Sequence, residues 1–175
     1  MASKTLGPVL RRLLRAPTWL FRARLGWLLA QRFLMITHLG RKSGREYRTV
    51  VEVVGRVRAN DEYVVMSGFG HTSDWLRNLQ AGGGREVAVG TRRFRPELRM
   101  LDVDEAATIL GDYERHNRLI APVVRRVLSG LVGWRYTGTE VGRRRLVHDL
   151  PLVALRPVRA AAAPRIDAVP REATR

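Results

Sequence analysis

Two amphipathic helical patterns occupy the first 32 positions of the chain. Apolar residues recur with the i, i+3, i+4, i+7 spacing of one helix face, first over 6–14 and then, after Pro17, over 19–29. Arginines interrupt both runs, so neither reaches the roughly 18 uncharged apolar residues of a membrane span, and neither fits a cleaved signal peptide. We expect these helices either to pack on the core or a second subunit, or to lie in a membrane interface with their arginines toward lipid head groups.

From Phe33 onward the apolar period shortens to two, which indicates β-strands. Six strand-like segments follow: FLMITHL (33–39), RTVVEVVGRV (48–57), EYVVMSG (62–68), EVAVG (86–90), RFRPELRML (93–101) and LPLVALRP (150–157). Pro96 makes the fifth segment an edge strand or a bulge, because proline has no N–H to donate. The pattern predicts a mostly β fold of about six antiparallel strands, and closure into a small barrel would remove their exposed edges.

Helical patterns flank and interrupt the strands. Ser73 and Asp74 can begin the short helix WLRNLQA, which three glycines at 82–84 end. A longer helical stretch runs from about 104 to about 132, is broken near Pro122 and has acidic residues at its start, as the helix dipole favours. We expect three parts: basic amphipathic helices over 1–32, a barrel domain over 33–157, and a disordered tail over 158–175, where no pattern remains.

The charge of the chain limits its partners. The net charge is +16, 30 of the 32 cationic residues are arginine, and ten Lys or Arg residues precede the first acidic residue, Glu46. A GC-rich codon bias or a need for solubility would account for the excess, but its concentration near the N-terminus suits anionic lipid, nucleic acid or a polyanionic ligand. We do not expect nucleic-acid binding, because few aromatic residues alternate with basic ones on the predicted strands.

The sequence is poor in reactive side chains. It contains no cysteine, which excludes disulfides, thiolate nucleophiles, zinc–thiolate sites and iron–sulfur clusters. The four histidines are scattered without the spacing of a metal site, and no Ser–His–Asp set can be assembled. We therefore assign no catalytic residue and no metal ligand. If the protein is an enzyme, a cofactor should carry the reaction.

The turn HLGRKSGREYRT, at 38–49, places glycines on both sides of Arg41, Lys42 and Ser43. It does not match a nucleotide-binding P-loop, because its lysine precedes the second glycine. Two interpretations remain open. The segment is an ordinary charged hairpin, or it is a seat for an anion that offers backbone N–H groups, two cationic side chains and a hydroxyl.

A second turn, SGFGHTSDWLRNLQA at 67–81, passes from a strand into a helix. The free N–H groups of a helix start can bind phosphate, and glycines allow a flat ring to approach the backbone. The alternative is a tight strand–helix connection with Trp75 and Leu79 in the core.

The two turns occur together, in an order and at a spacing that resemble the deazaflavin-dependent nitroreductase family, also described as F-420H₂-dependent quinone reductases. The shared features are T-x-x-G-R-K-S-G, a hydrophobic strand pair, V-V-x-S-G-x-G…D-W-x-R-N-L-x-A, a short V-x-V strand and the closing L-P-L-V-A-L-R-P. The resemblance runs from about Phe33 to Pro157. It implies a split β-barrel of the flavin-reductase type, usually actinobacterial, that binds coenzyme F-420. This coenzyme is an 8-hydroxy-5-deazaflavin with a phosphate-containing oligoglutamate tail; FMN is the less favoured cofactor.

The resemblance also implies a set of site residues. The anionic tail would lie on the first turn, and the deazaflavin along the end of the third strand and the start of the short helix. The cofactor-binding positions carried over are Arg41, Lys42, Ser43, Tyr47, Arg48, Thr49, Val50, Val65, Met66, Ser67, Gly68, Asp74, Trp75, Leu76, Arg77 and Asn78. Many relatives have a lysine where this chain has Gly68, so one cationic contact is either missing or replaced by Arg77 or Arg48. Candidate acceptor-binding residues are the C-terminal aromatics Tyr113, Trp134 and Tyr136.

The reaction that the resemblance implies is hydride transfer from C5 of the reduced deazaflavin to a quinone, nitro compound or similar electron-poor acceptor. The alternative is a non-catalytic protein that binds or carries F-420 or another anionic ligand. The expected partners are a small-molecule acceptor and an anionic membrane surface that meets the N-terminal helices, with no nucleic acid, in a monomer or homodimer. The expected location is cytoplasmic, with peripheral contact to the inner face of the plasma membrane if those helices bind lipid.

Overall fold

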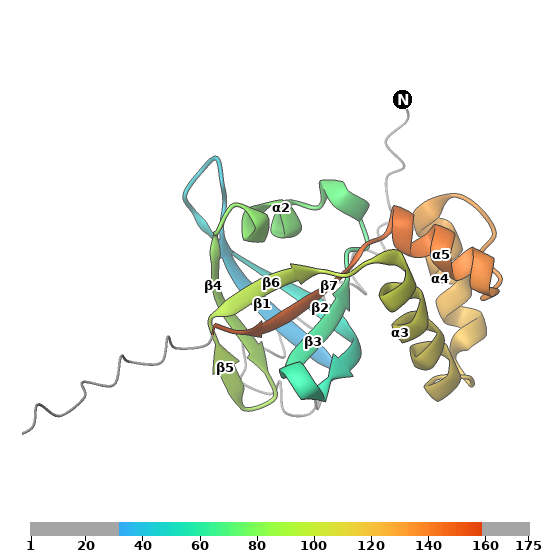
Figure 1. Cartoon of the computed structure of the whole chain (residues 1–175). Coiled ribbons are helices and arrows are strands. Elements are labelled where there is room, and N and C mark those ends of the chain that lie inside the picture. The colour runs from blue at the N-terminus through green and yellow to red at the C-terminus, as the bar shows by residue number, and fades with distance from the viewer. Residues whose placement is uncertain (1–31, 159–175) are drawn as a thin grey trace, which may run out of the picture.

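The computed structural model describes residues 32–158, which form seven strands and four α-helices (Figure 1). The strands are β1 Phe33–Leu39, β2 Glu46–Val57, β3 Glu62–Met66, β4 Gly84–Val89, β5 Arg92–Phe94, β6 Pro96–Met100 and β7 Leu152–Pro157. The helices are α2 Asp74–Gln80, α3 Val103–His116, α4 Ala121–Val132 and α5 Glu140–Asp149, with two 3₁₀ turns at Arg58–Asn60 and Gly70–Thr72. The helices predicted within 1–32 and the tail predicted over 158–175 lie almost wholly outside the described residues.

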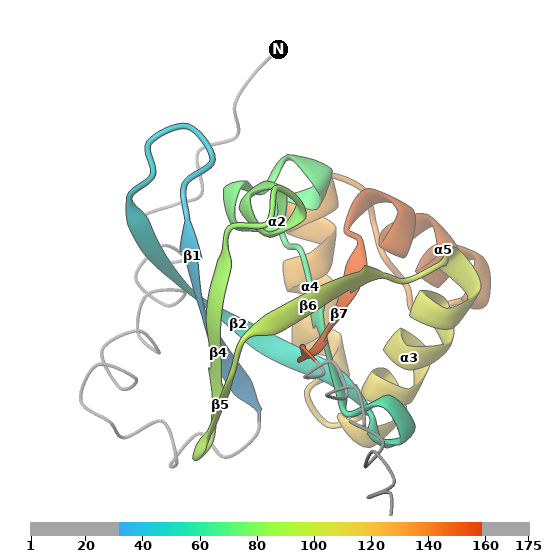
Figure 2. The same cartoon turned by 60° about the vertical axis from the view of Figure 1, so that its left-hand side comes forward.

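All neighbouring strands are antiparallel, in the order β5-β4-β1-β2-β3-β7-β6. The 12-residue strand β2 pairs with β1 through its first half and with β3 through its second half, and the register shifts between Val53 and Gly55. A bulge of this kind bends a strand, so β2 turns the corner between the two halves of the sheet. Strands β4 and β6 also come into contact (Figure 2), which nearly closes the barrel. The mostly β, split-barrel prediction is confirmed.

The seventh strand arises where the sequence predicted one continuous segment. RFRPELRML divides at Arg95: β5 ends at Phe94 and pairs with β4, whereas β6 begins at Pro96 and pairs with β7. Pro96 thus begins a strand at the edge of the sheet, where a residue without an N–H is tolerated. The division matters because it sends one chain segment to both ends of the sheet.

The helical prediction was right for two segments and missed a third. The break expected near Pro122 falls at 117–120, and Pro122 lies in the first turn of α4, where its fixed φ is favourable. Helix α5 was not predicted. It begins after Thr139, whose Oγ1 accepts a hydrogen bond from the N–H of Gly142 at 3.2 Å, but its arginine-rich sequence has little apolar periodicity.

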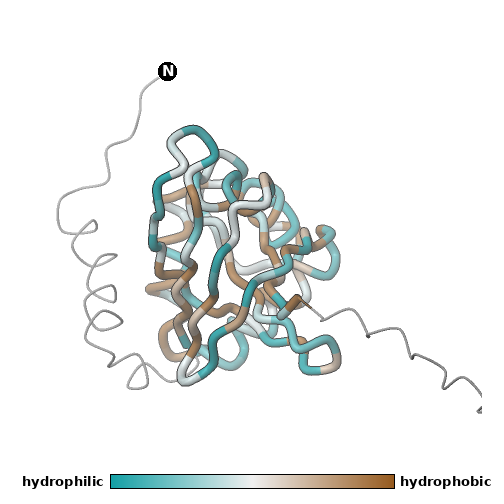
Figure 3. The backbone as a smooth tube through the Cα atoms, turned by 90° about the vertical axis from the view of Figure 1, so that its left-hand side faces the viewer, coloured by the Kyte–Doolittle hydropathy of each residue, from teal (hydrophilic) through white to brown (hydrophobic). Residues whose placement is uncertain are grey.

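Two hydrophobic cores lie on opposite faces of β3 and β7. Tyr63 and Val65 pack inside the barrel with Leu34, whereas Val64 packs against the helices with Leu110. Alternating side chains of a strand point to opposite faces, so a strand buried on both faces reads as a continuous apolar run. Figure 1 shows α3, α4 and α5 beside the barrel and α2 across one of its ends. Figure 3 shows hydrophobic and hydrophilic positions following one another along the strands.

Candidate functional site

The two turns singled out in the sequence lie together at the end of the barrel that α2 covers. They form an open cleft of about 710 Å³. The β1–β2 turn supplies one wall, and the segment from Phe69 through α2 supplies the other. The lining residues are His38, Gly40, Arg41, Lys42, Ser43, Tyr47, Arg48, Thr49, Phe69, Ser73, Asp74, Trp75 and Asn78.

Arg41 joins the two walls. Its backbone N–H and its Nη1 both donate to Oδ1 of Asn78 at 3.0 Å, and Nη1 also lies 2.9 Å from Oδ1 of Asp74. Asn78 is buried, whereas Asp74 is exposed in the first turn of α2, where the helix dipole favours a carboxylate. Arg41 was predicted to bind an anionic tail. In the structure its guanidinium instead connects the two turns, through Asn78 and Asp74.

His38 lies buried beneath this junction. Because Oδ1 of Asn78 accepts from Arg41, its amide nitrogen is the donor to Nδ1 of His38, at 3.0 Å. Nδ1 is then an acceptor, so Nε2 carries the proton and donates to Oγ1 of Thr49 at 3.2 Å. The pKa of His38 is lowered from 6.5, chiefly because burial disfavours the charged ring, although the charge of Asp74 opposes this. The ring is thus held neutral.

Two glycines allow the turns to approach. A Cβ on Gly40 would lie 2.6 Å from Oγ of Ser43 and 2.7 Å from the ring of Tyr47, and one on Gly83 would lie 2.8 Å from the carbonyl oxygens of Asn78 and Leu39. These contacts are too short for a real side chain. At Gly83 the close atoms belong to the backbone, so the absence of a side chain permits the return of the chain from α2 to β4. At Gly40 the side chains of Ser43 and Tyr47 would have to move.

Ser67 fixes the second wall from behind. Its hydroxyl donates to the carbonyl of Gly70 at 2.7 Å and is hydrogen-bonded to the Ser73 hydroxyl at 2.6 Å. Ser67 and Ser73 are both buried, and Ser73 is the residue that precedes α2. Ser67 therefore supports the cleft without lining it.

Among the described residues, Lys42 is the cation of the cleft that no acidic side chain neutralises. Arg41 is paired with Asp74, and Arg48 lies 3.2 Å from Glu46. Within residues 32–158, the ammonium of Lys42 makes no ion pair, and the N–H groups of Lys42 and Ser43 have no acceptor. The tip of the β1–β2 turn thus retains a free charge and two free donors.

Not every predicted cofactor residue lines the cleft. Val65 and Leu76 are wholly buried in the barrel core, and Met66 packs with the helical core. Gly68 faces the side chain of Leu131 on α4. Three other predicted positions also lie outside the lining: Val50 on β2, Ser67, and Arg77, which is exposed on α2.

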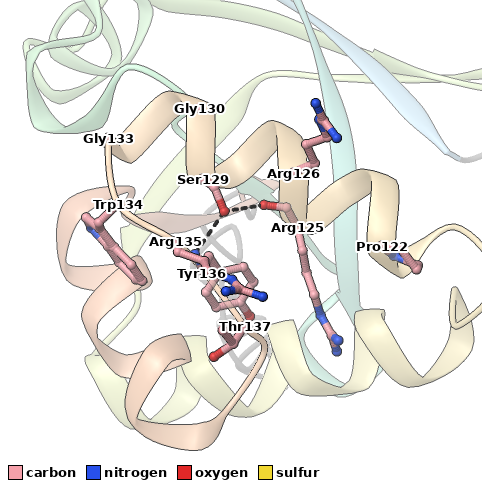
Figure 4. A pocket seen from close by; sticks show the side chains of 10 residues that line it. All are labelled: Pro122, Arg125, Arg126, Ser129, Gly130, Gly133, Trp134, Arg135, Tyr136 and Thr137. Carbon is pink, nitrogen blue, oxygen red and sulfur yellow. Dashed lines mark hydrogen bonds between the residues drawn. The ribbon is translucent and has the colours of Figure 1, made fainter.

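The three aromatic residues predicted to bind the acceptor are not brought together at the cleft. Tyr113 lines a different cavity of about 510 Å³, between β2 and α3, and donates to Oε1 of Glu52 at 2.8 Å. Burial and this contact raise the pKa of Tyr113 to about 12. Trp134 and Tyr136 line a third cavity, between α4 and the loop that follows it (Figure 4).

Sequence reasoning missed four lining residues: His38, Gly40, Phe69 and Ser73. The burial of His38 could have been predicted from the sequence, because His38 follows the core residues Leu34 and Ile36 at every second position of β1. A polar side chain at a core position next to a glycine-flanked turn indicates a structured polar contact. Phe69 is 58% exposed at the cleft, and its sequence position alone did not predict this.

Comparisons with known proteins bear on this geometry. A family model described as F420H(2)-dependent quinone reductase matches residues 14–119, more than half of the chain, including both turns that form the cleft. The chain belongs to this family. This membership confirms the resemblance to the F420H(2)-dependent quinone reductases that was seen in the sequence. No curated protein matches the chain by sequence.

Solved structures with a similar arrangement include three of low sequence identity. A protein of unknown function from Agrobacterium tumefaciens is 16% identical with a TM-score of 0.46; the match covers 89% of this chain and 59%, less than two thirds, of that protein. An F420-H2 dependent reductase is 15% identical with a TM-score of 0.41, and the match covers 72% and 94%. A pyridoxamine 5'-phosphate oxidase-related, FMN binding protein from Nostoc punctiforme is 17% identical with a TM-score of 0.40, and the match covers 89% and 83%.

Proposed function

We propose that this family member reduces a quinone, nitro compound or similar electron-poor acceptor, with reduced F420 bound in the cleft between the β1–β2 turn and α2. The observation that carries the proposal is that the two motifs matched by the family model, far apart in sequence, form one cleft. In this family the bound coenzyme, when reduced, supplies the hydride for the acceptor.

The cleft has the chemistry that a flat ring with an anionic tail requires. Lys42 and the free N–H groups of the β1–β2 turn suit negatively charged oxygens. Trp75 and exposed Phe69 offer apolar ring surface a short way from that charge. We therefore propose that Lys42 and Ser43 hold the tail and that Phe69, Trp75 and Thr49 border the ring.

The other residues of the cleft position these groups. Arg41 and Asn78 hold the two walls in one arrangement, and neutral His38 fixes Asn78 and Thr49 from below. Alignment of two reactants can replace a bimolecular encounter and lower a barrier by several kcal/mol. We assign no general acid, because the cleft is open and water can protonate the reduced acceptor.

F420 is favoured over FMN because the family is defined by F420H(2). A cationic turn would accept the phosphate of either molecule, so geometry alone does not separate them. Equilibrium titrations of the purified full chain with F420 and with FMN, at one ionic strength, measure the preference directly.

The acceptor and the wider context are further proposals. The roles of Tyr113, Trp134 and Tyr136 in acceptor binding stay predictions. We also propose a cytoplasmic protein, monomeric or homodimeric, whose N-terminal segment over 1–32 contacts the inner membrane surface. Within residues 32–158, no helix is long and apolar enough to cross a membrane, and no group of three or more metal-binding side chains occurs.

Turnover separates the proposed reductase from a carrier of the same coenzyme. The full chain is mixed with reduced F420 and menadione, a quinone, and then with a nitroaromatic acceptor, while the deazaflavin absorbance is followed. Catalytic oxidation of F420 above the rate without protein supports a reductase. Saturable F420 binding without turnover of either acceptor class would instead indicate a carrier. An absence of F420 binding would rule out both the reductase and the carrier.

A further inference from the structure

Helix α4 and the turn that leads into it present an apolar stripe to solvent. Leu119, Val123 and Val127 follow one another at intervals of four and are 90%, 65% and 42% exposed, with Ile120 beside them at 38%. The opposite side of the helix, with Leu128, packs on the helical core. We call Leu119, Ile120, Val123 and Val127 the α4 stripe. Exposed apolar residues that form one contiguous stripe indicate a binding surface more than scattered ones do.

The surroundings of the α4 stripe are strongly cationic. Residues 115–139 contain five arginines and one histidine and no Asp or Glu. Arg115 and Arg125 are neutralised by Asp112 and Glu114. Arg118, Arg126 and Arg135 make no ion pair with any residue in the described range 32–158.

A shallow cavity adjoins the stripe on the same helix. It has a volume of about 880 Å³ and is lined by residues along α4, from Pro122 onward, and by the following loop (Figure 4). Arg126, Arg135 and Trp134 are among its lining residues. Unpaired arginines and a tryptophan beside aliphatic side chains make up the composition of helices that lie at a membrane interface.

We propose that this surface binds an anionic lipid bilayer. The α4 stripe enters the interface, and Arg118, Arg126 and Arg135 contact lipid phosphates. The cavity between α4 and the following loop accommodates a head group. The proposal does not depend on the proposed reaction, and all of α4 lies beyond residues 14–119, which match the family model.

Charge complementarity favours lipid over the other occupants of such a surface. In a symmetric dimer the same patch meets itself. The free arginines of two copies would then come close together, with no carboxylate within 115–139 to neutralise them. The phosphates of a nucleic acid would pair with the arginines, but they would leave a row of aliphatic side chains without an apolar partner. An anionic bilayer satisfies both.

The absence of cysteine allows a test at a single position. Leu119→Cys in the full chain is labelled with the environment-sensitive fluorophore NBD and mixed with phosphatidylglycerol–phosphatidylcholine vesicles or with phosphatidylcholine vesicles. Thr91→Cys is the matched control, since Thr91 is exposed in the turn between β4 and β5. Figure 1 shows β5 on the opposite side of the barrel from α4. We expect a blue shift at position 119, not at 91, with the anionic vesicles alone, and its reversal by salt.

Vesicle sedimentation supplies a second measurement. Leu119→Asp with Val123→Asp should weaken binding to anionic vesicles by at least about fivefold. Val141→Asp, at an exposed valine of α5 next to Glu140, should leave it unchanged. Circular dichroism checks that both variants fold.

Three outcomes would overturn the proposal. If the protein sediments with anionic vesicles while the label at 119 stays in water, other residues bind the lipid. A blue shift that appears without vesicles and rises with protein concentration assigns the stripe to a second copy of the chain. A shift produced equally by an oligonucleotide assigns it to nucleic acid.

Discussion

The side-chain amide of Asn78 donates to Nδ1 of His38 at 3.0 Å, while its Oδ1 accepts two hydrogen bonds from Arg41. Asn78 belongs to α2, His38 to β1 and Arg41 to the turn that follows β1. One buried amide therefore ties together both walls of the cleft. All of its hydrogen bonds depend on a contact between segments about 40 positions apart in the chain.

Replacement of Asn78 should affect stability and binding together. Asn78→Ala leaves the ring nitrogen of His38 and the backbone N–H of Arg41 without their partner, and an unsatisfied buried polar group costs about 1–3 kcal/mol. Urea unfolding should show this loss, and F420 titration should show weaker binding. Gln80→Ala, on the exposed side of α2, is the control. If Asn78→Ala loses stability but keeps full affinity, the junction does not shape the site.

Stability should fall as the pH drops below 6.5. His38 is held neutral, and its pKa in the folded protein lies below the reference value of 6.5. Between these two values the unfolded chain binds more protons than the folded one, so the free energy of unfolding decreases as pH falls and is recovered above 6.5. Urea midpoints at a series of pH values measure the slope. The slope should be smaller in His38→Gln, whose side chain does not titrate, and an unchanged slope would refute this assignment.

Lys42 should matter for the ligand and not for the fold. Lys42→Glu reverses the free charge of the β1–β2 turn, so F420 affinity should fall at least about tenfold at low salt, and less at high salt. Exposed charges contribute little to folding, and the unfolding free energy should change by less than about 0.5 kcal/mol. Arg58→Glu, which makes the same charge change after the far end of β2, is the matched control. Equal losses in both variants would show a general electrostatic effect.

Phe69 is expected to contact the ring of the ligand. It is more than half exposed, so Phe69→Ala should leave the unfolding free energy nearly unchanged. Loss of a stacking partner should weaken F420 binding by about 0.5–1.5 kcal/mol, measured by titration. Val141→Ala, a similarly exposed apolar position on α5, should have no effect on binding. If Phe69→Ala binds F420 with unaltered affinity, the ring of the ligand does not contact Phe69.

The buried carboxylate of Glu62 should be important for stability alone. It is wholly buried and accepts from Nε and Nη2 of Arg99 at 3.1 and 2.7 Å, and Arg99 also contacts Glu105 on α3. Glu62→Ala leaves Arg99 partly exposed and still paired with Glu105, so urea unfolding should show the loss of about 1–3 kcal/mol that is typical of a broken buried hydrogen-bonded contact. Glu97→Ala, on the exposed side of β6, should cost about 1 kcal/mol or less. If Glu62→Ala and Glu97→Ala lose similar amounts of stability, the buried contact between Glu62 and Arg99 is not important for stability.

Local sequence patterns determined most of the fold. The strands of 33–39 and 62–66 have a strong apolar signal because their side chains fill a core on one face or both, and Pro122 favours the start of α4 by its fixed φ. The same patterns failed at α5, whose arginines lie on a mostly solvated helix, and at Arg95, where the division between β5 and β6 depends on which strands they pair with. Backbone pairing partners are a property of the whole sheet.

By itself, the sequence determined the alternation that makes a barrel, the two glycine-containing turns and the family to which they belong. The tertiary structure alone decided that both turns form one cleft, that Arg41 is occupied by Asn78 while Lys42 stays free, and that Tyr113, Trp134 and Tyr136 line other cavities. The physical reason is that periodicity and turn chemistry act between neighbours in the chain. Burial, ion pairing and the pKa of His38 depend on groups that only the closed barrel brings within reach.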